Sequence, residues 1–271
     1  MKNWFNKVLY QQASTRAFFT LWGVILNEIK VSVRQFYTWK NPFTVLQVVK
    51  YIFQSLLRMV LGRSVKLSYG FSGEDRLIES LLKPKITDRG YYVEVGCNHP
   101  TLFSNTFLFY RRGWSGICID GNKKLIKKYK FSRPKDTAIC AIVSDSTKPL
   151  EYLSLTNDVL STVERTGVEQ FLEQGQKITS REVVKPRSLT SILDVHEVPK
   201  HFNFLSIDAE GHDMNVLRSL DLNRYQPKLI LLELENFDAK ALVDNEVYQV
   251  LKDFGYIFAG IILKNVYFIK D

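Results

Sequence analysis

The feature that most constrains the fold is an apolar strand that stops at a glycine and is followed by a second strand that stops at an acid. The first is Tyr92-Val93-Glu94-Val95-Gly96, and the second is Gly116-Ile117-Cys118-Ile119-Asp120, which ends 24 residues after Gly96. In open α/β sheets, ligands bind beyond the carboxyl ends of the strands, and an acid after the second strand holds ribose hydroxyls. The spacing predicts a nucleoside site.

The turn after the first strand excludes one kind of nucleoside ligand. Gly96 is followed by Cys97-Asn98-His99-Pro100, so the second and third glycines of a dinucleotide fingerprint are missing. A pyrophosphate needs that close backbone approach. The sequence therefore favours a nucleoside without phosphates, with Glu94 accepting from an ammonium group or ordering the loop, and Asp120 holding both ribose hydroxyls.

From residue 70 onward, short apolar strands alternate with amphipathic helices, which predicts a mostly parallel sheet of the βα type. The segment 151–187 breaks this alternation and is predicted to be an insertion beside the site. Strands are expected at 91–97, 115–120, 136–143, 202–208 and 228–235, with an antiparallel pair at 256–263 and 265–270. Helices are expected at 74–83, 104–112, 122–130, 188–195, 212–220 and 244–254.

A second cluster of ionisable residues follows the fourth of these strands, in the run Asp208-Ala209-Glu210-Gly211-His212-Asp213. An acid at this carboxyl end faces the same crevice as Gly96. So many charges are costly in a sheet interior unless they serve a ligand, a metal or one another. Asp208 and Glu210 are candidate functional residues, His212 is either catalytic or structural, and Asp213 is a candidate helix cap.

Two acids and an amide also end the fifth strand, at Glu233, Glu235 and Asn236. Together with Asp208 they could supply oxygen ligands for a hard divalent cation. The alternative is a hydrogen-bonded network of carboxyl groups without a metal.

The net charge of +9 is confined to the first quarter of the chain, because residues 1–70 hold ten Lys or Arg and one acid. This quarter is rich in aromatic residues, and 44–61 has the apolar spacing of an amphipathic helix. The apolar run 18–26 is too short to cross a bilayer, and no small-residue cleavage site follows it. We interpret the region as a peripheral anchor on an anionic membrane surface; the alternatives are packing against the rest of the chain or a second copy, and nucleic-acid binding.

Several of these motifs, in order, resemble the FkbM-type S-adenosylmethionine-dependent methyltransferases. They are the run from Tyr92 to Pro100, Ser104-Asn105-Thr106, Arg112-Gly113-Trp114, and Ile207 to His212, with Ser72-Gly73-Glu74-Asp75 upstream and Gly255-Tyr256 near the end. The resemblance implies a class I methyltransferase fold and methyl transfer to a hydroxyl, often of a sugar or polyketide. It also implies that Glu74, Ser104 and Asn105 lie near the methionine end of the cofactor. Two positions depart from the pattern, with Asp120 where Glu is commoner and His212 where an acid is commoner.

We therefore expect residues 69–271 to form a Rossmann-like methyltransferase domain with a mostly parallel seven-stranded sheet, and residues 1–68 to form a basic helical region. The interpretation is an O-methyltransferase that uses S-adenosylmethionine and acts on a hydroxyl in a glycan, a glycolipid or a small molecule. The alternatives are a nucleic-acid methyltransferase and a non-catalytic nucleoside-binding module.

The three cysteines fit reduced thiols in a cytoplasmic protein. The candidate catalytic residues are Asp208, His212 and Glu210, and the candidate cofactor-binding residues are Glu74, Glu94, Gly96, Cys97, Asn98, Ser104, Asn105, Asp120, Gly121, Asn122, Ile142 and Asp208.

Overall fold

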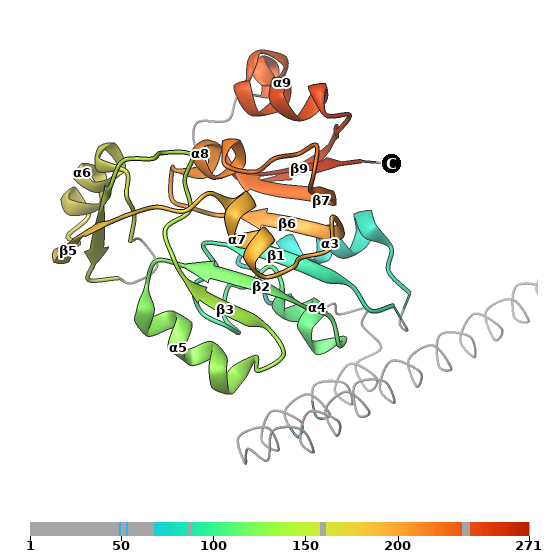
Figure 1. Ribbon diagram of the computed structural model, residues 1–271, viewed down its shortest axis with the longest axis horizontal. Coiled ribbons are helices and arrows are strands. Elements are labelled where there is room, and N and C mark those ends of the chain that lie inside the picture. Colours follow the sequence, from blue (N-terminus) through green and yellow to red (C-terminus); the bar gives the residue numbers. More distant parts are fainter. Residues whose placement is uncertain are drawn as a thin grey trace, which may run out of the picture. The chain divides into compact units, whose positions relative to one another are not determined.

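The computed structural model describes residues 49, 53, 68–85, 88–157, 161–234 and 239–270 (Figure 1). The expectations for the basic N-terminal region, including its amphipathic helix and its boundary at residue 68, lie outside the described residues apart from these two single positions. They stay predictions.

A seven-stranded sheet forms the centre of the described chain, in the order β3-β2-β1-β6-β7-β9-β8. Neighbours from β3 to β7 pair in parallel, whereas β9 is antiparallel to both β7 and β8. The strands are β1 (Tyr91–Val95), β2 (Ser115–Asp120), β3 (Thr137–Cys140), β6 (His201–Ile207), β7 (Gln226–Glu233), β8 (Ile257–Ile262) and β9 (Asn265–Ile269). The strand order reverses between β1 and β6, and ligands of such sheets bind at that point. This is the predicted class I methyltransferase fold.

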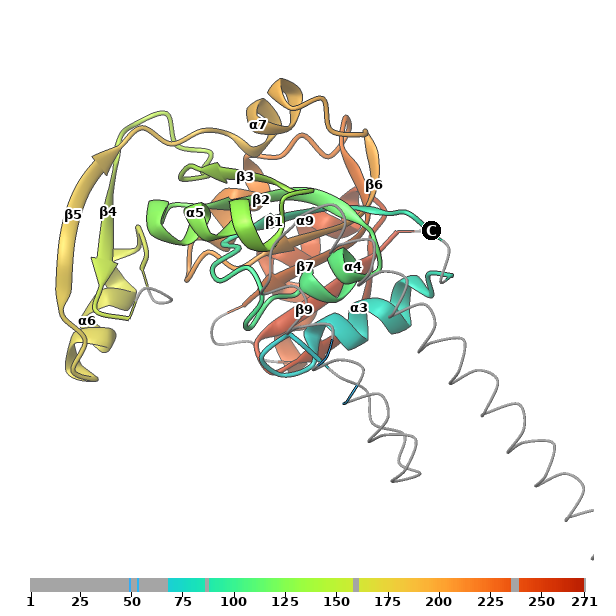
Figure 2. The ribbon, with the colours of Figure 1, turned by 90° about the horizontal axis from the view of Figure 1, so that it is seen from below.

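Helices cover both faces of the sheet, as Figure 2 shows for α7 on one side and α3 and α4 on the other. Alternate residues of a strand point to opposite faces, so Val93 and Val95 join the core under α7, α8 and α9, while Tyr92 and Glu94 face the other side. The helices are α3 (Glu74–Leu82), α4 (Phe107–Arg111), α5 (Lys123–Ser132), α7 (Leu189–Val195), α8 (Asp213–Arg218) and α9 (Glu246–Asp253), with a 3-10 helix at Ala239–Asp244. These six α-helices lie within the predicted ranges or within two residues of them, whereas the 3-10 helix was not predicted.

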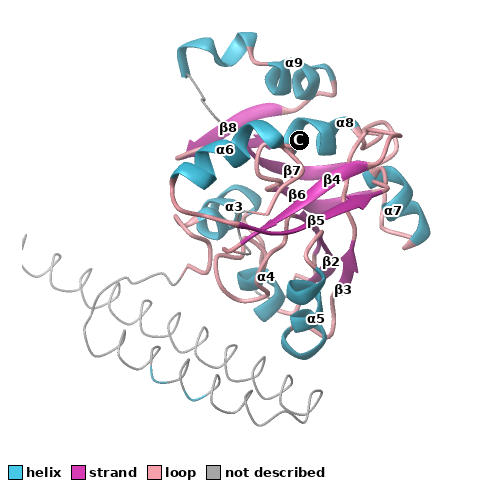
Figure 3. Ribbon diagram, turned by 90° about the vertical axis from the view of Figure 1, so that its left-hand side faces the viewer, coloured by secondary structure: helices cyan, strands magenta, loops and turns pink. Residues whose placement is uncertain are grey.

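The predicted insertion is a small structure of its own. It consists of the antiparallel strands β4 (Leu150–Leu155) and β5 (Ile178–Val184), with α6 (Arg165–Glu173) between them. Figure 2 shows this pair standing apart from the main sheet, and in the view of Figure 3 the pair overlaps the sheet. The break in the strand and helix alternation indicates the position of the insertion, but it does not indicate these strands or this helix.

The third strand is shorter than predicted at both ends. It was predicted over 136–143, but β3 spans Thr137–Cys140. At its start the Asp136 carboxylate accepts from the Gly116 amide and from Arg133, and after its end Val143 bridges to Arg187 outside the main sheet. In the described part of the chain, no helix is long and apolar enough to span a bilayer.

Candidate active site

A cavity of about 680 Å³ opens at the carboxyl ends of β1, β2, β6 and β7. Six acids line it, whereas Lys264 is the one Lys or Arg among the described lining residues. The acids are Glu74, Glu94, Asp120, Asp208, Glu210 and Glu233. Of the other predicted site residues, Gly96, Asn98, Asn105, Gly121, Ile142 and His212 also line the cavity, and Cys97, Ser104 and Asn122 do not. Such a lining is suited to a ligand that carries positive charge.

The glycine that ends β1 lies in backbone contact with the turn after β6. Gly96 has a φ of +76°, and a Cβ atom at this position would lie 1.6 Å from the Asp208 carbonyl oxygen. The Asp208 amide donates to the Val95 carbonyl at 2.9 Å. A glycine is therefore required here both by the backbone angle and by the space, and it brings the β1 and β6 turns together.

Asp120 is oriented toward the cavity by two backbone amides. Its Oδ2 atom accepts from Asn98 at 2.8 Å and its Oδ1 atom accepts from Asn122 at 2.7 Å. The Asn122 side chain caps α5 by accepting from the Lys124 amide at 2.9 Å, which explains why this residue lies outside the cavity lining. The two backbone donors fix the direction of this carboxylate, and a carboxylate with its two acceptor oxygens is a group suited to a diol.

Glu94 is a buried carboxyl group that faces the cavity from the middle of the site. Its Oε2 atom accepts from the Thr106 hydroxyl at 2.5 Å and lies 3.8 Å from Nη1 of Arg133. Burial raises the pKa of Glu94 to about 7, although Arg133 and Thr106 act in the opposite direction. A cationic group bound nearby would favour the ionised form of Glu94.

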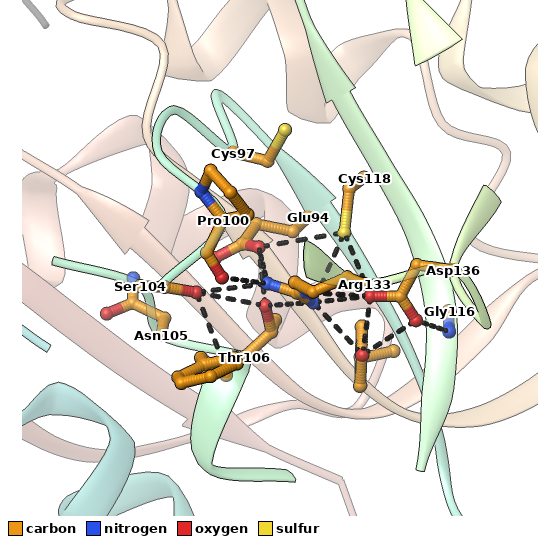
Figure 4. Close-up of polar contacts among 12 residues, drawn as sticks. Glu94, Cys97, Pro100, Ser104, Asn105, Thr106, Gly116, Cys118, Arg133 and Asp136 are labelled. Atoms are coloured by element: carbon orange, nitrogen blue, oxygen red, sulfur yellow. Dashed lines mark hydrogen bonds and ion pairs between the residues drawn. The ribbon is translucent and has the colours of Figure 1, made fainter. Parts of the chain in front are cut away.

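Beneath Glu94 lies a fully buried arginine that sequence reasoning missed (Figure 4). Arg133 pairs with Asp136 at 2.7 Å and donates to the Thr106 hydroxyl at 2.8 Å. The other groups it donates to are the Tyr92 hydroxyl, the Ser104 hydroxyl, the Pro100 carbonyl and the Cys118 sulfur. Buried charges require such complete pairing. The arginine thus fixes the loop that carries Asn105 and the carboxyl group of Glu94.

This network explains two predicted cofactor residues that lie behind the cavity wall. Ser104 accepts from Arg133 at 3.2 Å and from the Phe107 amide at 3.2 Å, so it orders the start of α4. Cys97 is buried, and its carbonyl accepts from the Tyr129 hydroxyl at 2.7 Å. Both residues support the walls of the cavity and do not line it.

Asp208 lies among other acids at the end of β6. Burial raises its pKa well above the usual range for an aspartate, and the nearby carboxylates of Glu210, Glu233 and Asp213 raise it further. Asp208 also hydrogen-bonds to Glu233. The group therefore binds a proton more strongly than an ordinary aspartate does.

Asp213 holds the ends of two strands together, in addition to starting α8. Its Oδ1 atom accepts from the amides of Ala209 at 3.4 Å and Glu233 at 3.3 Å. Burial and the neighbouring Glu233 raise the pKa of Asp213 to about 7. His212, and not Asp213 as predicted, occupies the cap position before the helix.

His212 has both ring nitrogens engaged. Nδ1 lies 2.5 Å from Oε1 of Glu164, and Nε2 lies 2.9 Å from the Ser144 hydroxyl. If Nδ1 carries the proton and donates to the carboxylate, Nε2 accepts from the serine. The ring of His212 therefore connects the insertion to the start of α8. Because both ring nitrogens already have partners, Asp208 is the better candidate for a proton acceptor.

Only two of the four candidate metal ligands, Asp208 and Glu233, are described, so the metal site stays a prediction. Glu235 and Asn236 lie outside the described residues. Elsewhere in the described ranges, no three His, Cys, Asp or Glu side chains are arranged to hold a metal ion. Glu233 instead pairs with Lys264 at 3.3 Å.

An open sheet with a glycine turn after β1, and with Asp120 at the end of β2 and Asp208 after β6 on one cavity, is typical of the class of proteins that bind a nucleoside. The family described as the methyltransferase FkbM domain matches residues 94–258. This is more than half of the chain, which therefore belongs to the FkbM methyltransferase family. The resemblance seen in the sequence is confirmed, and S-adenosylmethionine is the cofactor that the family implies.

Solved structures with a similar arrangement are distant in sequence. One is a TehB-like SAM-dependent methyltransferase from Corynebacterium glutamicum, at 12% identity and a TM-score of 0.39, covering 82% of this chain and 97% of that one. Another is the human methyltransferase 10 domain containing protein, at 12% identity and a TM-score of 0.39, covering 85% of this chain and 97% of that one. No curated protein matches the sequence significantly.

The residues present fit the cofactor of this family. Asp120 has the acceptor atoms for a ribose diol, and the six acids of the lining suit a molecule with a sulfonium and an ammonium group. Glu74 is buried at the start of α3, where it accepts from the Ser72 amide at 2.8 Å. Glu74 and Asn105, which the family resemblance places near the methionine end of the cofactor, both line the cavity.

Proposed function

We propose that this methyltransferase transfers the methyl group to a hydroxyl, and that Asp208 takes the proton of that hydroxyl. S-adenosylmethionine supplies an electrophilic methyl group when bound. A hydroxyl is a weak nucleophile, so a positioned base is needed to accept its proton as the new bond forms. The proposal depends on one observation, the cavity-lining carboxyl of Asp208 with its raised pKa.

The neighbours of Asp208 make it suited to this task. A carboxylate with a raised pKa is a stronger base once it is ionised, and positive charge in the acidic cavity favours its ionised form. Asp208 and Glu233 are hydrogen-bonded, so the pair can share a proton. The backbone contact between Asp208 and Gly96 keeps the base beside the turn that follows β1.

The insertion supports an acceptor with several hydroxyl groups. It contributes polar side chains to the cavity wall, and these can donate to and accept from an alcohol. They belong to Tyr152, Asn157, Ser161 and Thr162. We propose that the acceptor is a sugar of a glycan or glycolipid, bound between the insertion and the end of β6.

The charge of the cavity argues against a nucleic-acid acceptor. A phosphate backbone is neutralised by Lys and Arg, whereas six acids and Lys264 line this cavity. A module that binds nucleosides without catalysis would not need the acidic group around Asp208, which is costly to bury. An anionic membrane surface and a second copy of the chain stay predictions for residues 1–68.

The test uses the full chain with S-adenosylmethionine carrying a labelled methyl group, and a glycan and glycolipid extract as acceptor. We expect the label in a methyl ether that resists alkali, identified by mass spectrometry. Asp208→Asn should lose about 10²–10⁴-fold in turnover while it binds S-adenosylhomocysteine with little change. Label on nitrogen or in RNA, or full turnover of Asp208→Asn, would contradict the proposal.

A further inference from the structure

Three exposed apolar side chains surround the mouth of the cavity. They come from separate loops: Phe71 precedes α3, Phe103 lies between β1 and α4, and Leu263 lies in the turn between β8 and β9. Their exposed fractions are 73%, 61% and 70%, and all three line the cavity. We call these three residues the apolar rim. Large apolar groups gathered at a cavity mouth indicate a binding surface.

Two of the three rim residues have a backbone conformation that is unfavourable for them. Phe103 and Leu263 each have a φ of +52°. A bulky residue rarely adopts this left-handed region, and Gly or Asn usually occupies it. Leu263 is at the first of two turn residues joining β8 to β9, a position at which glycine is common. Backbone strain and exposed apolar surface both lower the stability of the folded state. The stability of the fold therefore does not explain these side chains.

Contacts with the cavity hold the rim in place. Lys264, beside Leu263, pairs with Glu233, and the Asn265 side chain lies 3.5 Å from Glu74. The aromatic rings of Phe71 and Phe103 pack edge to face, with centroids 5.3 Å apart. The rim thus forms an ordered apolar entrance to an acidic interior.

We propose that the methyl acceptor carries an apolar group next to its reactive hydroxyl, and that the apolar rim binds this group. The inference rests on the proposed function, because it assigns the substrate class of the same site. An amphipathic acceptor would place its hydroxyl toward Asp208 while its apolar part covers Phe71, Phe103 and Leu263. Covering them removes apolar surface from water, which offsets the cost of exposing them in the free protein.

The test compares two probes that differ in their apolar group, n-octyl β-D-glucopyranoside below its micelle concentration and methyl β-D-glucopyranoside. Binding to the full chain saturated with S-adenosylhomocysteine is measured by calorimetry. Each buried methylene adds about fourfold in affinity, so we expect the octyl compound to bind at least tenfold more tightly. Equal affinities would overturn the proposal.

Variants locate the binding surface. The double variant Phe71→Ser/Phe103→Ser should lose most of its preference for the octyl probe, with Leu263 supplying what is left. Leu263→Gly should weaken octyl binding yet raise the thermal midpoint, since glycine removes the backbone strain; a destabilised Leu263→Gly would contradict the strain argument. The matched control is Phe131→Ser, because Phe131 is 68% exposed and is not part of the cavity lining.

Two further outcomes separate this inference from other readings. If the double variant loses binding to phosphatidylglycerol vesicles and keeps its preference for the octyl probe, the rim is a membrane contact and the proposal is wrong. Probe binding does not require methyl transfer. A failure of O-methylation with intact octyl preference would therefore overturn the proposed function and leave the apolar rim assigned.

Discussion

The guanidinium of Arg133 lies 2.7 Å from the carboxylate of Asp136, and both side chains are fully buried. Removing one partner of a buried pair leaves an uncompensated charge and costs about 3–5 kcal/mol. We therefore predict that Arg133→Met lowers the free energy of unfolding by this amount in urea denaturation. Arg181→Met is the control, because Arg181 pairs with Glu151 at the surface and such pairs contribute about 0–1 kcal/mol. Equal losses in the two variants would contradict the role of burial.

Gly96 should tolerate no side chain. A Cβ atom there would collide with the Asp208 carbonyl, so Gly96→Ala should cost more than about 3 kcal/mol of stability and remove measurable binding of S-adenosylhomocysteine. Gly175→Ala provides the comparison, since Gly175 also has a positive φ, of +86°, but no atom lies within 4 Å of the added carbon. Its cost should be the strain alone, about 1–2 kcal/mol. Cofactor binding by Gly96→Ala at the wild-type level would refute the assigned packing.

Asp120→Ala should weaken binding of S-adenosylhomocysteine by about 10–100-fold, because charged hydrogen bonds contribute about 1.5–3 kcal/mol each. Calorimetry on the purified chain measures the change. Asp194→Ala is the control, since Asp194 belongs to α7 and is not part of the cavity lining. Unchanged affinity in Asp120→Ala would remove the ribose assignment.

The stability of the ligand-free protein should depend on pH through Asp213. Its pKa is raised from 3.8 to about 7 by burial and by Glu233. The folded state therefore binds a proton more tightly than the unfolded state, and this contribution to stability is lost as the pH rises from about 4 to 7. Unfolding in urea at several pH values should show wild type losing stability relative to Asp213→Asn over that interval. A constant difference between the two proteins would contradict the assigned pKa.

His212→Ala should loosen the insertion. The ring connects α8 to Glu164 and Ser144, and each lost hydrogen bond in a buried site costs about 1–3 kcal/mol. Hydrogen exchange of the β4 and β5 amides should become about tenfold faster, measured by mass spectrometry. Asn215→Ala is the control, because Asn215 donates to Asp145 at the surface of the same helix. Wild-type exchange in His212→Ala would show that other contacts hold the insertion.

The site residues that could be predicted are those that directly follow an apolar strand, because ligands of open α/β sheets bind at the carboxyl ends of the strands. Gly96, Asp120 and Asp208 each follow an apolar strand, and parallel strands end at one edge of a sheet. Arg133 gave no such signal, because it follows a basic, exposed stretch of α5, and its role depends on residues far from it in the chain. The hydrogen bonds of His212 could not be predicted either, since its partners come from the insertion and from the segment after β3.

The contact between Gly96 and the Asp208 backbone has a consequence for how this enzyme can diversify. It joins the turns after β1 and β6 into one frame, while the insertion from Leu150 to Val184 pairs its strands with each other and not with the main sheet. Under the proposed function, this frame carries the methyl-transfer chemistry and the insertion contacts the acceptor. Exchange or lengthening of this one segment would then be a route by which new acceptors are acquired in evolution.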